Sequence, residues 1–364
     1  MKKNIIFFHP NINDDGCKKT LEIYCNYLIN KFNICLITNT SNKNLLRNLN
    51  AKINIVNLKN NFFSKYSFLN EIYCVFKLFK LNYRNPKIIS LDGYFILLFL
   101  KFLKFNFKLI VRIANPILKN NLNKKLFTTD AGLEIGKLDL IFLKYSDLTI
   151  LYAEKFKSYL YKKYNLRNII IIRNYFKKNK IKKRKKKNKI FNIFFIGRLV
   201  DIKDPIFFLK NLINLPEACN IKIHIIGKGP LLNNLKLIAK KKKSIVKFHG
   251  FVKNPYEKLK HKIDIFCLTS KYDGTPNVLG EAISMKIPCI APRHVGCVNE
   301  LLGNGKFGQL YSPKNPKDFQ HKLRSIIKNY NKALINADKA YKALDKYSLD
   351  NTLKKLERKI LSIF

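Results

Sequence analysis

Two carboxylates, Asp273 and Glu281, lie in the stretch SKYDGTPNVLGEA, which begins at residue 270. Thr275 is a favoured N-cap residue, Pro276 suits the first position of a helix, and Pro288 is expected to end the element. The pattern predicts a helix of about ten residues that begins at the edge of a sheet. Asp273 then lies in the loop before this helix, and Glu281 lies more than one turn inside it.

A helix start of this kind attracts anions, because its N–H groups have no partner within the helix and its dipole is positive at that end. Two carboxylates on one crevice can hold different hydroxyl groups of a single ligand, as a sugar attached to a nucleotide ribose requires. In the alternative interpretation, Asp273 is a second capping residue and Glu281 is a solvated helix charge. The apolar neighbours Val278, Leu279 and Ala282 argue against an exposed Glu281, so we favour ligand binding.

A basic pair follows the apolar run Phe191–Ile196, in the sequence GRLVDIKD. The run is typical of a buried strand, so Arg198 and Lys203 are expected at the carboxyl edge of a sheet, where α/β folds bind ligands. A guanidinium binds two phosphate oxygens at once and an ammonium adds a point charge, a combination that suits a diphosphate leaving group. The alternative is that both residues are surface charges of a very basic chain.

Glycines follow two other predicted strands. Gly227 and Gly229 stand in the sequence IIGKGP, and Gly16 ends the segment Asn13–Gly16 between the first strand and the first helix. Where a Cβ atom is missing, the backbone can approach a ligand closely, and the amide of Gly16 can reach a phosphate. A plain tight turn explains each of these glycines about as well.

Short apolar runs rich in β-branched residues alternate with helical periods along the chain. Their repetition predicts an α/β protein with two Rossmann-like, doubly wound domains. The clearest helical period is Cys17–Lys31, in which apolar residues recur on one face. The predicted strands are Ile5–His9, Ile34–Thr38, Ile53–Asn57, Lys87–Leu91, Lys108–Arg112, Leu148–Tyr152, Ile169–Ile172, Phe191–Ile196, Ile221–Ile226, Ile245–His249, Ile263–Leu268, Pro288–Ala291 and Gly308–Leu310.

The length of 364 residues also favours two domains. The run Lys177–Lys189 is dominated by Lys and Arg, so it cannot bury itself and is expected to be an extended linker. We therefore predict an N-terminal domain over residues 1–176, a linker over 177–189, a C-terminal domain over 190–346 and a final helix over 347–364.

The chain carries 71 basic and 23 acidic residues, and the resulting net charge of +48 attracts the phosphates of nucleic acid, anionic lipid or nucleotides. Lys, Asn, Ile and Phe are enriched together and share A/T-rich codons, so part of this excess reflects genome composition. Eight cysteines without a CxxC pair indicate reduced thiols. The longest apolar run, Tyr94–Leu100, is too short to span a bilayer, and the N-terminus does not read as a signal peptide, so we expect a cytoplasmic protein.

Several motifs are missing from the sequence. There is no Asp-x-Asp, and the six histidines show no ligand spacing, so the sequence predicts no metal site. There is no Walker lysine loop and no complete GxGxxG, which disfavours an ATPase or a dehydrogenase. A nucleotide-sugar substrate, used without a metal cofactor, is the interpretation that fits the motifs present.

In these motifs, the second half of the chain resembles glycosyltransferase family 4, whose members are retaining enzymes of the GT-B fold. The similarity spans residues 190–312 and rests on the order and spacing of FIGR, IGKGP, FHG, the block at 270–282 and Gly308. The first half matches loosely, through Gly16, Arg112 and the sequence IRN at 172–174.

The resemblance implies that the two domains face a cleft and that the final helix crosses back onto the N-terminal domain. It implies that Asp273, in an Asp-x7-Glu motif, contacts the transferred sugar and that Glu281 contacts the nucleotide ribose. Arg198 and Lys203 would then hold the diphosphate. Further donor contacts are implied for Gly16, Gly197, Gly227, Gly229, Thr275, Asn277, Val278 and Leu279, and the acceptor side would include Arg112 and Asn115.

Two departures from the family pattern matter. The family's first Glu is Asp273 here, one methylene shorter, which draws the carboxylate back and leaves the identity of the sugar open. A His that many members carry after the strand ending at Arg112 is absent, since Ala114 stands near that place. No general acid or base is therefore assigned, and retaining transfer can proceed by attack from the same face, with the diphosphate accepting the proton.

Residues 94–108 are helical in pattern, with Lys101, Lys104 and Lys108 in a narrow arc. A basic amphipathic face can lie on an anionic membrane surface, where a lipid-linked acceptor would be met. An ordinary sheet-covering helix with a lysine stripe is equally consistent. A peripheral position on the inner face of the cell membrane is therefore one open alternative.

Three functions follow from these features. The favoured one is a retaining, metal-independent, hexosyltransferase-type glycosyltransferase that moves a sugar, with a UDP-sugar favoured as donor, to a lipid-linked or polysaccharide acceptor in cell-envelope glycan synthesis, such as lipopolysaccharide or capsule. A second is a catalytically weak GT-B protein that binds a nucleotide sugar. A third, disfavoured because it leaves the block at 270–282 unexplained, is a nucleic-acid binder that uses Lys177–Lys189.

Overall fold

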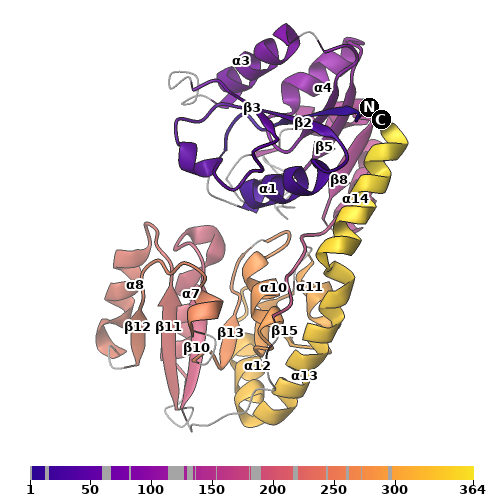
Figure 1. The fold of residues 1–364 in the computed structure, drawn as a ribbon. Coiled ribbons are helices and arrows are strands. Elements are labelled where there is room, and N and C mark those ends of the chain that lie inside the picture. The colour runs from indigo at the N-terminus through magenta and orange to yellow at the C-terminus, as the bar shows by residue number, and fades with distance from the viewer. Residues whose placement is uncertain are drawn as a thin grey trace. The chain divides into compact units, whose positions relative to one another are not determined.

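The computed structural model describes residues 2–12, 16–59, 67–81, 83–113, 127–128, 134–135, 137–152, 154–179, 181, 190–215, 220–242, 245–259, 262–271, 273–293 and 297–364. The chain divides into two compact units, one formed by Met1–Asn174 with Asp350–Phe364 and the other by Tyr175–Leu349. Each unit holds one parallel β-sheet with helices packed against it (Figure 1).

The sheet of the first unit has seven strands in the order β3-β2-β1-β4-β5-β8-β9, and every pairing is parallel. The order reverses at β1, since the chain runs from β1 to β2 and β3 on one side and then returns to β4 on the other. The strands are β1 (Asn4–Phe8), β2 (Asn33–Thr38), β3 (Asn54–Asn57), β4 (Lys87–Ser90), β5 (Lys108–Arg112), β8 (Leu148–Leu151) and β9 (Ile169–Ile171).

Helices of the first unit connect and cover these strands. They are α1 (Gly16–Leu28), α3 (Ser67–Lys80), α4 (Phe95–Phe102), α5 (Lys137–Phe142), α6 (Glu154–Tyr164) and α14 (Leu349–Ile363), with 3-10 turns η1 (Lys43–Leu45) and η2 (Leu143–Tyr145). A small antiparallel pair is formed by β6 (Phe127–Thr128) and β7 (Glu134–Ile135).

The second unit repeats this architecture with a six-stranded parallel sheet in the order β12-β11-β10-β13-β14-β15. Its strands are β10 (Phe191–Ile196), β11 (Ile221–Ile226), β12 (Val246–Phe248), β13 (Ile265–Cys267), β14 (Cys289–Pro292) and β15 (Gln309–Tyr311). Its helices are α7 (Pro205–Ile213), α8 (Leu232–Ala239), α9 (Pro255–Leu259), α10 (Asn277–Ser284), α11 (Val298–Leu301), α12 (Pro316–Lys328) and α13 (Tyr330–Ala343), with 3-10 turns η3 (Asp201–Lys203), η5 (Lys240–Lys242), η6 (Gly303–Gly305) and η7 (Leu344–Tyr347).

The prediction of two doubly wound α/β units is confirmed, and each predicted strand is present with bounds that differ by at most two residues. Burial on both faces of the sheet explains why these strands could be predicted from short apolar runs in the sequence. In β1, Ile5 and Phe7 enter one apolar cluster while Ile6 and Phe8 enter another on the opposite face. A strand buried on both sides is apolar at nearly every position, which distinguishes it from its neighbours in the sequence.

The helix predicted over residues 94–108 is wrong in its second half. It ends at Phe102, because Lys104 adopts a left-handed backbone conformation with φ 64° and Lys108 is already the first residue of β5. The side chain of Lys101 is held by Asp147, at 3.0 Å between Nζ and Oδ2. The three lysines therefore form no common helical arc.

The predicted basic linker falls mainly on residues 180 and 182–189, which lie outside the described residues. Its described beginning packs on the second unit. The amide of Asn179 donates to Ser284 Oγ at 3.2 Å, and Tyr341 Oη donates to the Asn179 carbonyl at 2.9 Å.

The cysteine prediction agrees with the described residues, in which seven cysteines are free thiols and six of these are buried. Cys219 lies outside the described residues. In the part of the chain that the structure describes, no helix combines the length and apolar character needed to cross a bilayer.

The C-terminal helix α14 belongs to the core of the first unit. Leu353, Leu356 and Ile360, one helical turn apart, are buried in the same apolar cluster as residues of β1 and α1. Glu357 accepts hydrogen bonds from Tyr27 Oη at 2.8 Å and from Lys31 Nζ, both at the C-terminal end of α1 and just beyond it. The last residues of the chain therefore complete a unit that begins with the first.

We expect Leu356→Ala to lower the free energy of unfolding of the first unit by about 2–5 kcal/mol, because it leaves a cavity in a fully buried position. Leu361→Ala on the exposed side of the same helix should change it by about 0.5 kcal/mol or less. Urea unfolding of the full chain measures both. Equal effects of the two substitutions would contradict the packing described.

Candidate functional site

The sheet of the second unit reverses its strand order at β10. The chain passes from β10 to β11 and β12 on one side and then to β13 on the other side of β10. In open α/β sheets, ligands bind where such neighbouring strands end and their loops diverge. Arg198 and Lys203 follow β10, and Asp273 follows β13, so the sheet brings these three sequence-predicted residues to one edge.

Lys203 and Asp273 form a direct ion pair, with 2.7 Å between Nζ and Oδ2. The Asp273 side chain is 2% exposed and that of Lys203 is 17% exposed, so the pair is largely removed from water. Ser270 Oγ donates a longer bond of 3.4 Å to the same carboxylate oxygen. The sequence predicted both residues for the site but not their pairing.

Hydrogen bonds to backbone carbonyls hold the two loops of this pair together. Thr269 Oγ1 donates to the carbonyls of Lys203 and Asp204, at 3.1 and 3.0 Å. The amide of Lys271 donates to the carbonyl of Ile202 at 2.9 Å. Asp204 in turn caps α7 by accepting from the Phe207 amide at 3.1 Å. The loop after β10 is therefore fixed both to α7 and to the loop after β13.

The glycine loop after β11 packs against the loop that carries Arg198. Gly197 donates to the Ile226 carbonyl and Leu199 to the Lys228 carbonyl, each at 3.0 Å. A Cβ atom on Gly227 would overlap the carbonyl oxygen of Gly197, and one on Gly229 would overlap that of Leu199. These two glycines are thus required by contact between loops, and this contact positions the exposed Arg198.

The helix predicted after Thr275 exists, but its start was placed one residue too early. The structure puts Pro276 at the N-cap position and Asn277 first in α10, and the helix has eight residues. Thr275 is buried in the preceding turn. Proline at the N-cap provides no side-chain cap, so residue preferences that favour threonine there gave the wrong start.

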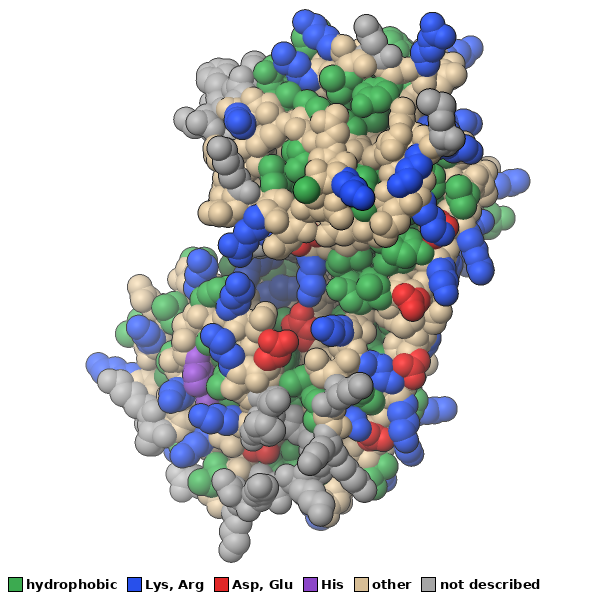
Figure 2. Space-filling view, in the orientation of Figure 1, with side chains coloured by type: hydrophobic (Ala, Val, Ile, Leu, Met, Phe, Trp, Pro, Cys, Tyr) green, Lys and Arg blue, Asp and Glu red, His purple; other side chains and the backbone are tan. Residues whose placement is uncertain are grey.

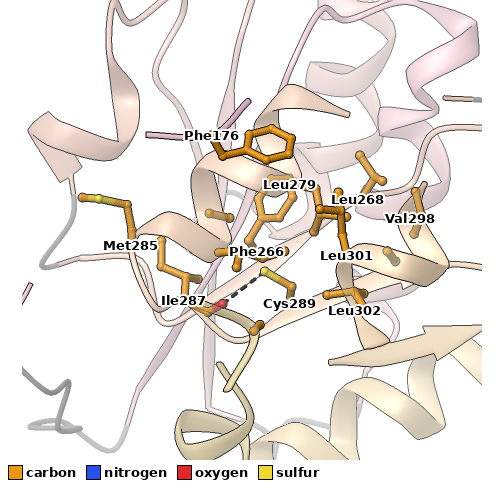
Figure 3. Close-up of a cluster of buried hydrophobic side chains, with 14 of the residues drawn as sticks. Phe176, Phe266, Leu268, Leu279, Met285, Ile287, Cys289, Val298, Leu301 and Leu302 are labelled. Atoms are coloured by element: carbon orange, nitrogen blue, oxygen red, sulfur yellow. Dashed lines mark hydrogen bonds between the residues drawn. The ribbon is translucent and has the colours of Figure 1, made fainter. Parts of the chain in front are cut away.

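The predicted donor contacts on α10 divide into core and accessible positions. Leu279 points into the apolar cluster with Phe266 and Leu268 of the β13 segment, and its amide donates to the Pro276 carbonyl at 3.0 Å (Figure 3). Asn277 and Val278 are half-buried in the first turn of α10.

Glu281 also lies on α10 and is half-buried rather than fully exposed. The segment that enters the unit helps to place this helix, because the ring of Phe176 packs directly on Gly280, where any side chain would overlap it. Tyr256 Oη adds a bond of 2.6 Å to the Val278 carbonyl. The helix that carries Glu281 is therefore fixed on two sides.

In the first unit, Arg112 lies at the end of β5 and is 2% exposed. Its Nη2 donates to Thr20 Oγ1 at 3.1 Å, and the guanidinium carbon lies 4.6 Å from the ring centre of Tyr152 and 5.8 Å from that of Tyr24. Among the described residues, Nε and Nη1 have no hydrogen-bond partner. Asn115 and residues 13–15 lie outside the described residues, and Gly16 is the first residue of α1.

His9 is a polar residue near Arg112 that the sequence analysis did not select. It follows β1 at the strand-order reversal of the first sheet, and burial together with the charge of Arg112 lowers its pKa from 6.5 to about 3. Neither ring nitrogen has a hydrogen-bond partner among the described residues. The available signal was its position, since a polar residue at the C-terminal end of a predicted parallel strand lies at the edge of the sheet where α/β folds bind ligands.

Residues 176–343 match the protein family described as glycosyl transferases group 1, just under half of the chain. The chain is 30% identical over 148 residues to a Campylobacter jejuni enzyme named GalNAc-α-(1→4)-GalNAc-α-(1→3)-diNAcBac-PP-undecaprenol α-1,4-N-acetyl-D-galactosaminyltransferase, covering 40% of this chain and 41% of that one. It is 29% identical over 111 residues to the lipopolysaccharide 1,6-galactosyltransferase of Salmonella typhimurium, covering 29% and 31%. Less than half of each relative is therefore matched.

Solved structures are similar over nearly the whole chain. A structure of HepE from Anabaena in complex with UDP and glucose has a TM-score of 0.75 at 15% identity, covering 99% of this chain and 100% of that one. The apo lipopolysaccharide outer core galactosyltransferase WaaB has a TM-score of 0.74 at 16% identity, with coverage of 99% and 100%. This chain has the GT-B fold. The expected fold class is thus confirmed.

Two of the described histidines of the second unit lie close together. Among the described residues, no group of three or more His, Cys, Asp or Glu side chains could hold an ion. His224 and His249 instead bond each other at 2.9 Å, and His224 also bonds Asn192 Oδ1 at 3.1 Å. Burial and the neighbouring charges lower the pKa of His224 from 6.5 to about 4, so this pair is neutral at pH 7.

We expect acid to destabilise the N-terminal unit partly through His9. The unfolded residue takes up a proton near pH 6.5, but the folded residue does so only near pH 3, so stability is lost as pH falls through this window. In the wild type, His9 should account for about 2 kcal/mol of the decrease in free energy of unfolding from pH 7 to pH 5. His9→Leu should remove this part of the decrease, whereas His321→Gln, at an exposed position, should leave the decrease unchanged. Urea unfolding at both pH values tests this, and the same pH dependence in all three proteins would refute it.

Proposed function

We propose that this chain is a glycosyltransferase that moves a sugar from a nucleotide-sugar donor, in the first instance a UDP-sugar, to a lipid-linked or polysaccharide acceptor in cell-envelope glycan synthesis. The observation that carries the proposal is the paired Lys203 and Asp273 at the strand-order reversal of the second sheet, next to Arg198 and to the start of α10. The family match covers this unit, and HepE, which has the same fold, is described with UDP and glucose bound. The named relatives act on undecaprenol-linked glycan or lipopolysaccharide.

The donor would lie across the β10 and β13 loops. Arg198 and Lys203 would bind the diphosphate, with Gly197, Gly227 and Gly229 as close backbone neighbours and the first turn of α10 facing the same charge. Asp273 would accept hydrogen bonds from hydroxyl groups of the transferred sugar, and Glu281 would accept them from the nucleotide ribose. An ammonium has three donor hydrogens, so Lys203 can hold Asp273 and a phosphate oxygen together.

The proposed reaction retains the anomeric configuration and needs no metal ion. The bond from the anomeric carbon to the diphosphate oxygen breaks while the acceptor oxygen bonds to the same face of that carbon. The acceptor proton passes to the departing diphosphate oxygen, so charge and protons balance without a protein base. Arg198 and Lys203 stabilise the charge that develops on the diphosphate. Arg112 and the segment around Asn115 are proposed for the acceptor side.

A donor screen tests the proposal. The full chain is incubated with UDP- and GDP-sugars, with and without EDTA, and nucleotide release is followed by liquid chromatography. We expect release with one sugar preferred, no effect of EDTA and an α product from an α donor by NMR. Saturable binding without release would instead indicate a nucleotide-sugar-binding protein, and binding of RNA alone would overturn the assignment.

Substitutions in the donor site should separate its residues from other charges of the same unit. Arg198→Ala and Glu281→Ala should each lower kcat/KM by at least about 100-fold, because they remove charged contacts to the donor. Arg324→Ala on α12 and Glu257→Ala on α9 are matched controls at exposed positions and should retain wild-type rates. Wild-type rates in the two site variants would contradict the assignment.

Asp273→Glu, which restores the longer side chain of the family pattern, should retain activity if Asp273 only holds the sugar and lose it if the pair with Lys203 sets the geometry.

A further inference from the structure

Large exposed hydrophobic side chains concentrate on one part of the first unit. Seventeen such residues are exposed among those described, and ten of them lie between residues 68 and 141. These ten, which we call the apolar patch, are Phe68, Leu69, Ile72, Phe76, Leu81, Phe99, Phe102, Leu103, Phe105 and Ile141. Single exposed apolar residues are ordinary, but a gathering of this size on one surface indicates an interaction site.

Helix α3 is apolar on its outer face as well as on its inner face, where Cys74, Val75 and Leu78 are buried. At 100° per residue, Phe68, Leu69, Ile72 and Phe76 fall within one arc, and this arc faces solvent, with Phe76 55% exposed. The opposite arc carries polar residues into the interior, among them Glu71, which accepts from the Ile96 amide at the start of α4 at 2.6 Å. These buried bonds fix the orientation of the helix and leave its apolar arc outward.

The patch continues from α3 across α4 to η2. Phe68 lies 6.3 Å from Phe95 between ring centres, and Phe95 lies 5.9 Å from Phe142. Phe102 lies 5.5 Å from Phe142 and 5.2 Å from Tyr145. The aromatic rings therefore form one connected surface rather than separate spots.

Basic side chains surround this surface. Lys80 lies over the ring of Phe76 at 4.6 Å, Lys144 lies over Tyr145 at 5.1 Å, and Lys104 and Arg84 are exposed on the adjoining loops. Figure 2 shows hydrophobic side chains interspersed with Lys and Arg over the part of this unit where Figure 1 draws α3 and α4.

The described residues of the helices beside these lysines include one acidic side chain. Among the described residues of α3, α4 and η2, the one carboxylate is Glu71, which is buried. The described residues of α3, α4 and η2 therefore combine exposed apolar side chains and lysines with no exposed negative charge.

We propose that the apolar patch inserts into the surface of a bilayer that contains anionic lipid. Phenylalanine and leucine side chains at the centre would enter the region between headgroups and acyl chains, and the lysine ammonium groups would reach the phosphates. A second copy of the chain fits this face less well, because two basic rims would then oppose each other. The proposal concerns residues of the first unit, whereas the proposed donor site lies in the second, and it is consistent with a lipid-linked acceptor for the proposed function.

Vesicle sedimentation tests the proposal with the full chain. Wild type should bind vesicles of phosphatidylcholine mixed with phosphatidylglycerol, and bind vesicles of phosphatidylcholine alone more weakly. The double variant Ile72→Ser, Phe76→Ser should lower the partition coefficient at least about tenfold, because two large side chains lose their contact with lipid. Lys80→Gln with Lys104→Gln should weaken binding to the anionic vesicles alone.

The matched control is Leu237→Ser with Phe251→Ser, two side chains that are 71% and 69% exposed in the second unit. It should bind vesicles like wild type. Circular dichroism checks that each variant folds, and nucleotide release from soluble donor, measured in parallel, separates failure of this proposal from failure of the proposed function. Vesicle binding that is unchanged in the patch variant, or a dimer by light scattering that the patch variant dissociates, would overturn the proposal.

Discussion

The candidate donor site depends on one buried ion pair. Removing a carboxylate from water is unfavourable by several kcal/mol unless a partner offsets it, and the partner of Asp273 is the ammonium of Lys203. The pair also connects the loops after β10 and β13, which are neighbours in the sheet but separated by 70 residues in the sequence. A cation held in place before any ligand arrives is what a diphosphate site requires, because little reorganisation is then needed when charge develops. The short side chain of Asp273 fits this arrangement, since it keeps the carboxylate close to the strand end.

The residues around the pair act mainly through the backbone. Thr269 binds two carbonyls of the opposite loop, and Gly227 allows that loop to approach the end of β11. None of these contacts needs to touch a ligand, yet each one limits where Arg198 and Lys203 can lie. This explains why glycines and a threonine accompany charged residues in the motifs: the charges perform the proposed binding, and the small residues set the distances between them.

Much of the fold was predictable from the sequence, and the reasons are specific. Strands buried on both faces, such as β1 and β10, are apolar at nearly every position and are short. Residues at strand ends, such as Arg198, were placed at the sheet edge for the same reason. The pairing of Lys203 with Asp273 was not predictable, because it depends on β13 lying beside β10, and strand order leaves no local trace in the sequence. The burial of His9 beside Arg112 depends on strand order in the same way, since β1 and β5 are separated by β4.

The spacing of apolar residues in α3 does not show which face of this helix is buried. Apolar residues on a surface helix are assumed to face the sheet, but α3 is apolar on both sides, so its pattern does not identify the inner face. The buried polar residues determine which face of α3 points inward. Asn70 accepts from Asn39 Nδ2 at 2.7 Å and donates to the Pro10 carbonyl at 3.1 Å, and these partners lie in loops after β2 and β1. An unpaired buried amide is costly, so these bonds hold Asn70 inward and force the remaining apolar arc toward solvent. The outward apolar face is therefore a consequence of buried polar contacts, and the proposed insertion into a bilayer would remove this face from water.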